Sequence, residues 1–147
     1  MPFPATQVIH TAWSRHHQPI VLGSMNGLCK VTDPARQQPG TLDPDTDVMS
    51  APTPHVVVPD GTLCRVQRIQ DYREGQQAGE TIRARLYQVG LPIDAPLAEQ
   101  GMRITITGRV GDAKIEAGVI GTTLTIVDRY RGTEEWDRVY ICEYNAG

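Results

Sequence analysis

Apolar residues recur with helical spacing near the start of the chain. They fall at spacings of three, four, seven and eight, which is the stripe of one helical face: Ala5, Val8, Ile9, Ala12 and Trp13. Pro4 suits the first turn of a helix, and Pro19 lies just past its end. The sequence therefore predicts an N-terminal α-helix over residues 5–17, with Trp13 on its buried face.

The rest of the chain has a different pattern, in which apolar and polar residues alternate or form short β-rich runs. Glycine- and proline-rich turns separate these runs, which cover residues 28–32, 55–58, 62–69, 81–89, 102–108, 122–128 and 138–144. No pattern typical of a crossover helix lies between them. The sequence predicts a mainly β protein: one domain over residues 1–147, built as a small antiparallel β-barrel or sandwich of six to seven strands.

Residues 33–55 interrupt this pattern. The segment holds five prolines and few large apolar side chains; the prolines are Pro34, Pro39, Pro44, Pro52 and Pro54. Each proline fixes φ and removes a backbone donor, so the segment is predicted to be neither helix nor strand. A loop of this length in a compact domain is usually disordered or functional, which makes it the first place to look for a function.

The composition excludes several classes of protein. A charged fraction of 21% and a net charge of −3 describe an ordinary soluble protein and oppose tight, non-specific DNA binding. Cys29, Cys64 and Cys142 lie far apart among apolar neighbours, which indicates buried, reduced thiols and a reducing cytoplasm. No leader and no apolar run long enough to span a bilayer is present, so we expect no membrane partner.

Asp43, Asp45 and Asp47 alternate as the first carboxylates of a calcium loop do. The glycine and the bidentate glutamate that such a loop requires are replaced by Val48 and Pro54. The pattern therefore favours a solvated acidic loop over a calcium site, and no metal site is predicted.

No catalytic signature emerges. His16 and His17 are adjacent and would point about 100° apart on a helix, which does not suit a zinc site. Neither Ser14 nor Ser24 has the context of a nucleophile elbow. We expect a protein that is not an enzyme and has no cofactor.

Five arginines of the predicted strands could line one face of the sheet as a surface for nucleic acid: Arg65, Arg68, Arg83, Arg85 and Arg103. Aromatic residues make up only 5% of the chain, too few for a surface that stacks nucleic-acid bases. A solvated or protein-contacting face is therefore favoured. The interface candidates are Arg65, Arg83, Arg85 and Trp13.

The C-terminal part of the chain resembles a known family. "GTLCRVQRI", "RARLYQVGLPIDAPLAEQGMRITITG" and "IGTTLTIVDRYRGTEEWDRVYICEY" follow one another between Gly61 and Tyr144. Their order is similar to that of the small head-to-tail connector proteins of long-tailed phages, the head-completion or stopper family, especially those of actinobacterial phages and prophages.

The resemblance implies a β-barrel with an N-terminal helix that assembles as a ring, a hexamer or dodecamer, in the virion neck after synthesis in the host cytoplasm. The partners implied are the portal or adaptor protein, and the tail terminator or tail tube protein. The loop at residues 33–55 would project into the channel. Several copies of Asp33, Asp43, Asp45 and Asp47 would then form an acidic collar that lets double-stranded DNA pass without specific binding.

Two other functions stay open. One is a tail terminator or minor tail protein, which would share a β-rich ring fold. The other is a cellular β-barrel module that binds a small ligand or an oligonucleotide.

Overall fold

The computed structural model describes residues 12–77, 80–115, 118–131 and 136–144. One helix precedes six strands: α1 (Trp13–Gly23), β1 (Gly27–Gln38), β2 (Thr53–Gln77), β3 (Glu80–Pro92), β4 (Arg103–Arg109), β5 (Thr123–Arg129) and β6 (Asp137–Tyr144). Within these residues no helix is both long and apolar enough to cross a bilayer.

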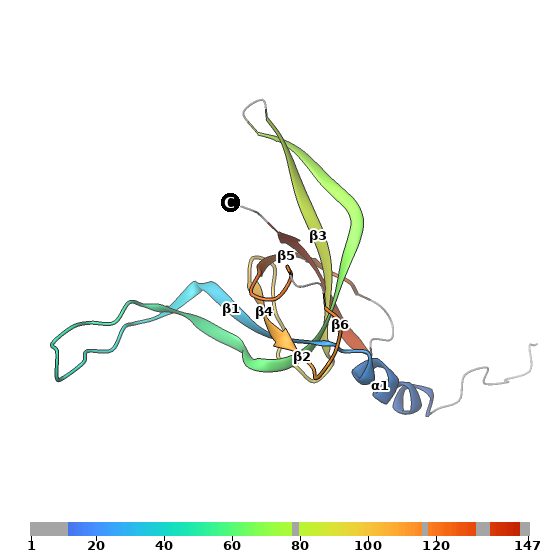
Figure 1. Cartoon of the computed structure of the whole chain (residues 1–147), viewed down its shortest axis with the longest axis horizontal. Coiled ribbons are helices and arrows are strands. Elements are labelled where there is room, and N and C mark those ends of the chain that lie inside the picture. Colours follow the sequence, from blue (N-terminus) through green and yellow to red (C-terminus); the bar gives the residue numbers. More distant parts are fainter. Residues whose placement is uncertain (1–11, 78–79, 116–117, 132–135, 145–147) are drawn as a thin grey trace, which may run out of the picture.

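The six strands form a closed antiparallel barrel in the order β1-β2-β3-β6-β5-β4, and β4 pairs with β1 to close it (Figure 1). Neighbouring strands are mostly joined by hairpins, as expected where no crossover helix separates them. The predicted fold class, a small antiparallel β-barrel with an N-terminal helix, is confirmed.

Two of the predicted strand runs, 55–58 and 62–69, belong to the single strand β2. Cys29 on β1 faces Thr62, whereas Val31 faces Val58, so β2 carries extra residues between these two pairs. The "PDG" sequence at 59–61 is therefore an irregularity within a strand, and Gly61 takes the positive φ of 84° that this bend requires.

Alternate residues of the strands fill the interior of the barrel. The largest fully buried side chains are Tyr140, Leu91, Ile104, Ile106, Leu124, Ile126, Val31, Val58, Val89, Cys29, Cys64 and Cys142. The three cysteines are free and buried, as their apolar neighbours predicted. Apolar burial inside a barrel without open edges is the main source of the stability of this fold.

The helix prediction is correct in kind and wrong in its bounds. The described helix is Trp13–Gly23, and residues 5–11 lie outside the described residues. Pro19 is within the helix, so the helix lacks one backbone donor instead of ending there. Trp13 is 40% exposed, contrary to the predicted burial, because the face turned toward the barrel carries the half-buried Gln18, Val21 and Leu22.

Residues 33–55 are not an irregular loop. β1 continues to Gln38, β2 begins at Thr53, and Leu42 pairs with Met49 in a further antiparallel bridge. Prolines fit this two-stranded ribbon because each of its strands has one edge that needs no backbone donor. We call residues 33–55 the β1–β2 arm; it extends from the barrel, as does the outer part of the β2–β3 hairpin (Figure 1).

Candidate interaction site

The tip of the β1–β2 arm is a tight turn held by Asp43. The backbone N–H of Asp43 donates to the carbonyl of Val48 (3.0 Å), and the N–H of Asp47 donates to the carbonyl of Asp43 (2.8 Å). The carboxylate of Asp43 also accepts a hydrogen bond from the N–H of Asp45 (3.0 Å). Asp47 adopts a positive φ of 56°, which aspartate tolerates better than most residues. The "DPDTD" sequence thus closes a hairpin.

Leu42 and Met49 form an apolar pair just below this turn. Backbone hydrogen bonds flank the pair on both sides, from Asp43 to Val48 and from Ser50 to Thr41. Leu42 and Met49 are therefore a non-hydrogen-bonded pair, the arrangement in which opposite side chains come closest. Their side chains are 53% and 63% exposed, and Val48, on the other face of the arm, is 61% exposed.

The arm tip is also acidic. Asp43, Asp45 and Asp47 are all exposed. The hydrogen bond from the Asp45 backbone, followed by one from Thr46, lowers the pKa of Asp43 below its usual value. A carboxylate that accepts such bonds is stabilised in its charged form. The tip therefore presents three carboxylates beside exposed apolar side chains.

Asp33 is not part of this acidic tip. It lies at the base of the arm, is only 9% exposed, and accepts a hydrogen bond from the N–H of Ala35 (2.9 Å). Its other carboxylate oxygen lies 3.7 Å from Nε of Arg36. Of the four aspartates predicted to face a channel, three lie together at the arm tip. Asp33 lies apart from them, at the base of the arm, where its carboxylate contacts Ala35 and Arg36.

Of the arginines predicted as interface candidates, the structure describes the side chains of Arg65 and Arg85. Arg65 forms an ion pair with Asp137 (Nη2 to Oδ2, 3.0 Å) in a partly buried position between β2 and β6. Arg85 is exposed on β3, and the side chain of Arg83 lies outside the described residues. Arg65 thus connects two strands of its own barrel.

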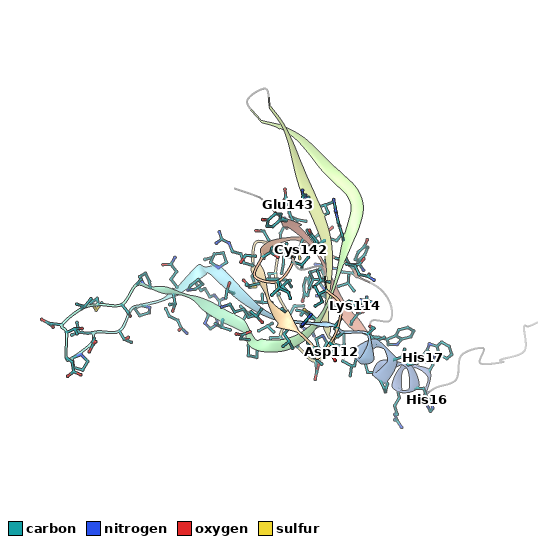
Figure 2. All side chains as sticks on the ribbon, viewed as in Figure 1. His16, His17, Asp112, Lys114, Cys142 and Glu143 are labelled. Carbon is teal, nitrogen blue, oxygen red and sulfur yellow. The ribbon has the colours of Figure 1, made fainter. Side chains whose placement is uncertain are left out.

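Helix α1 contacts the barrel at Trp136, the residue before β6. The side-chain amide of Gln18 donates to the carbonyl of Trp136 (2.8 Å), and the ring of His17 stacks between those of Trp13 and Trp136, with centroids 3.7 and 5.7 Å away. Figure 2 labels His16 and His17 on this helix, on the side of the barrel opposite the arm. The outer face of α1 leaves Ile20 67% exposed.

Neither a metal cluster nor a reactive thiol stands out among the described residues. No group of three or more histidine, cysteine, aspartate or glutamate side chains lies close enough there to hold a metal ion. Burial raises the pKa of the Cys142 thiol to about 12, and a hydrogen bond with Cys64 and burial raise that of Cys29. Both thiols stay protonated near neutral pH, and a protonated thiol is a poor nucleophile.

A small cavity of about 90 Å³ is lined in part by Asn26, Arg68, Tyr87 and Lys114. The buried side-chain oxygen of Asn26 accepts no hydrogen bond from the described residues. This cavity has room for a few water molecules only.

The sequence pattern missed Leu42, Met49 and Ile20 as exposed apolar residues. One signal was present for the first two: they flank the "DPDTD" turn symmetrically, as the last pair of a hairpin does. Ile20 carried no such signal because it lies beyond Pro19, where the helix was predicted to have ended.

No curated protein matches the chain. One family model does, and it covers residues 17–143, from the middle of α1 to the end of β6. Its description is "Family of unknown function (DUF6093)". Because the match includes most of the 147 residues, the chain belongs to the DUF6093 family.

Proposed function

We propose that this protein is a structural component of the neck of a long-tailed phage virion, a head-to-tail connector of the stopper type. Several copies form a ring between the portal or adaptor protein and the tail. The resemblance of the segment from Cys64 to Tyr144 to the connector family supports this class of protein, and a small barrel with projecting hairpins is compatible with a ring subunit.

The β1–β2 arm is the observation that carries the proposal. A two-stranded ribbon is marginally stable in water by itself, and apolar side chains that cluster on an exposed surface are one mark of an interaction site. This arm nevertheless extends from the barrel with Leu42, Val48 and Met49 more than half exposed at its tip. Contact with other protein chains in a ring would bury these side chains.

The charge of the arm suits a DNA channel. Asp43, Asp45 and Asp47 lie on one tight turn, so a ring of several copies brings many carboxylates together. Like charges repel DNA phosphates, which lets DNA pass without adhering, and the repulsion weakens as salt is added. We propose that the arms line the channel and close it until a tail is attached.

The test begins with the oligomeric state of the purified full-length chain. We expect rings in electron microscopy and a matching mass in size-exclusion chromatography with light scattering, either for the free protein or after addition of DNA-filled heads. Head-dependent assembly favours a connector, whereas assembly on isolated tails favours a tail terminator. A chain that stays monomeric under all these conditions and binds oligonucleotides would contradict the proposal.

A further inference from the structure

The outer face of β1, β4 and β5 is polar and carries positive charge. On these strands the alternate side chains that point away from the core are Lys30, Thr32, Arg103, Thr105, Thr123 and Thr125. We call these six residues the β1–β4–β5 face. Two of them are cations and four are threonines, so no carboxylate belongs to this face.

The strand register makes this face one continuous surface. Directly opposed residues form two rows: Lys30, Thr105 and Thr123 in one, and Thr32, Arg103 and Thr125 in the other. Opposed residues on neighbouring strands have Cβ atoms about 5 Å apart. The hydroxyl oxygens of Thr105 and Thr123 are 3.1 Å apart and share a hydrogen bond, which fixes both side chains on the outer surface.

The two cations of the face are not neutralised by their own molecule. Within the described residues, neither Lys30 nor Arg103 forms an ion pair. Glu143 lies opposite Thr125 at the border of the face, but its carboxylate makes no ion pair with Arg103. Both positive charges are therefore open to the carboxylates of a partner.

An exposed apolar side chain lies beside these cations. Thr32 pairs with Val56 on β2 and with Arg103 on β4, so Val56 and Arg103 flank the same threonine. Val56 is 48% exposed. A partner that fits this surface combines carboxylates with apolar side chains. DNA phosphates would match the cations but leave Val56 without a contact.

The tip of the β1–β2 arm has the composition that this surface requires. Leu42 and Met49 form one exposed apolar pair, next to the three carboxylates of the turn. Complementary charge of this kind orients partners and suppresses wrong pairings. The three carboxylates outnumber the two cations, so the joined surfaces would still repel DNA.

The tip cannot reach the face of its own molecule. Val56 and Met49 are seven residues apart in the sequence, which is about 23 Å along an extended strand. Figure 1 shows that the arm points away from the barrel. The tip and the face are different surfaces, so one copy can dock its tip on a second copy and offer its own face to a third. Such head-to-tail contacts generate rings when the rotation closes.

We propose that the β1–β4–β5 face of one copy, with Val56 at its border, is the docking site for the β1–β2 arm tip of the adjacent copy. Leu42 and Met49 pack against Val56. The tip aspartates lie beside Lys30 and Arg103. The inference rests on the proposed ring, and it names the contact that joins neighbouring subunits.

Cysteine crosslinking of the full-length assembled protein tests this contact. Leu42→Cys and Val56→Cys are combined in one chain and treated with a bis-maleimide that is too short to join them within one molecule. The unsubstituted protein is the first control, since its three cysteines are buried. The matched control combines Leu42→Cys with Ile20→Cys, because Ile20 is 67% exposed on α1, away from the face.

We expect the Leu42→Cys, Val56→Cys variant to give a ladder of dimers, trimers and larger products. An equal mixture of the two single variants should stop at dimers, because each chain then carries one reactive thiol. The matched control should give at most a tenth of the product.

Reversal of one charge tests the polar part of the contact. Arg103→Glu, added to the Leu42→Cys, Val56→Cys chain, should lower the yield of crosslinked product about tenfold, because a carboxylate then faces the tip aspartates. Adding Asp45→Lys to that variant should restore the yield to within about twofold. Arg85→Glu makes the same change of charge on β3, outside the face, and should leave the yield unchanged.

Several results would overturn the contact. Leu42→Cys alone giving dimers would mean that arm tips meet each other, and equal product from the Ile20→Cys control would place the tip on α1. Unchanged crosslinking after Arg103→Glu would mean that the charges do not meet. If the same variant also retains less double-stranded DNA, the face binds DNA phosphates instead.

The outcome also separates the contact from the ring. Rings without any crosslinked ladder would refute the contact and leave the connector proposal intact. Ladders of open chains without rings would refute the ring and leave the contact intact.

Discussion

Tyr140 is the largest side chain that lies fully inside the barrel, and its hydroxyl accepts a hydrogen bond from the backbone N–H of Ala98 (3.1 Å). Tyr140→Phe removes this acceptor and leaves a buried donor unpaired. We expect a loss of about 1–3 kcal/mol in the free energy of unfolding, measured with urea. Tyr130→Phe is the control because Tyr130 is 54% exposed and should be neutral. Equal stability of both variants would mean that water replaces the hydroxyl.

Because of Cys142, the free energy of unfolding is expected to depend on pH in the alkaline range. Burial raises its pKa from 9.0 to about 12, so the folded protein binds this proton more tightly than the unfolded chain does. The resulting stabilisation is complete below pH 9 and is lost as the pH rises from 9 toward 12. Cys142→Ala should therefore lose less stability than the unsubstituted protein between pH 9 and 11 in urea titrations. Parallel curves for the two proteins would contradict this account.

At the scale of elements, the β1–β2 arm should be separable from the barrel. Replacing residues 39–52 with Asn-Gly would join Gln38 to Thr53, which already face each other, through a two-residue turn of the kind that hairpins favour. Residues 41–50 are all exposed, so little core is lost. We expect the thermal midpoint to change by only a few degrees and ring formation to fail. A variant that still forms normal rings would show that the arm is not needed for assembly.

The arm also shows where prediction from sequence succeeded and where it failed. The barrel strands were predictable because one face of each enters the core, so that Ile104 and Ile106, for example, alternate with polar neighbours. In the arm both faces are exposed and the alternation disappears. Prolines then indicated a loop, although a ribbon with free edges accommodates them.

The prediction of the bounds and buried face of helix α1 failed for a related reason. The apolar stripe that ends at Trp13 predicted the burial of that residue, but the described helix continues through Pro19 to Gly23 and turns Gln18, Val21 and Leu22 inward. A proline costs a helix one hydrogen bond, which contacts elsewhere in the fold can offset. The contact of Gln18 with Trp136 has a sequence separation of 118 residues, and no local pattern predicts it.

At the scale of the whole molecule, the important feature is the separation of unlike surfaces. The β1–β2 arm, with its acidic and apolar tip, and helix α1, with the exposed Ile20, leave the barrel on opposite sides (Figure 1). Strand order decides this arrangement, because the arm emerges where β1 passes into β2 and α1 precedes β1. The residues were visible in the sequence, whereas their placement depends on barrel closure.

The separation of charge and apolar area on the arm tip leads to a last prediction. In the triple variant Asp43→Asn, Asp45→Asn, Asp47→Asn, the apolar pair Leu42 and Met49 is retained, so rings should still form. Each copy loses three negative charges, and repulsion of DNA phosphates falls accordingly.

Purified rings of this variant should therefore retain more double-stranded DNA than unsubstituted rings at low salt, in a filter-binding or gel-shift assay. The difference should disappear at about 0.5 M salt, where charges more than a few ångströms apart are screened. The paired control is Leu42→Ser, Met49→Ser, which keeps the charge and should weaken assembly instead. If the triple variant binds DNA no better than the unsubstituted protein, the aspartates do not face the channel and the acidic collar is wrong.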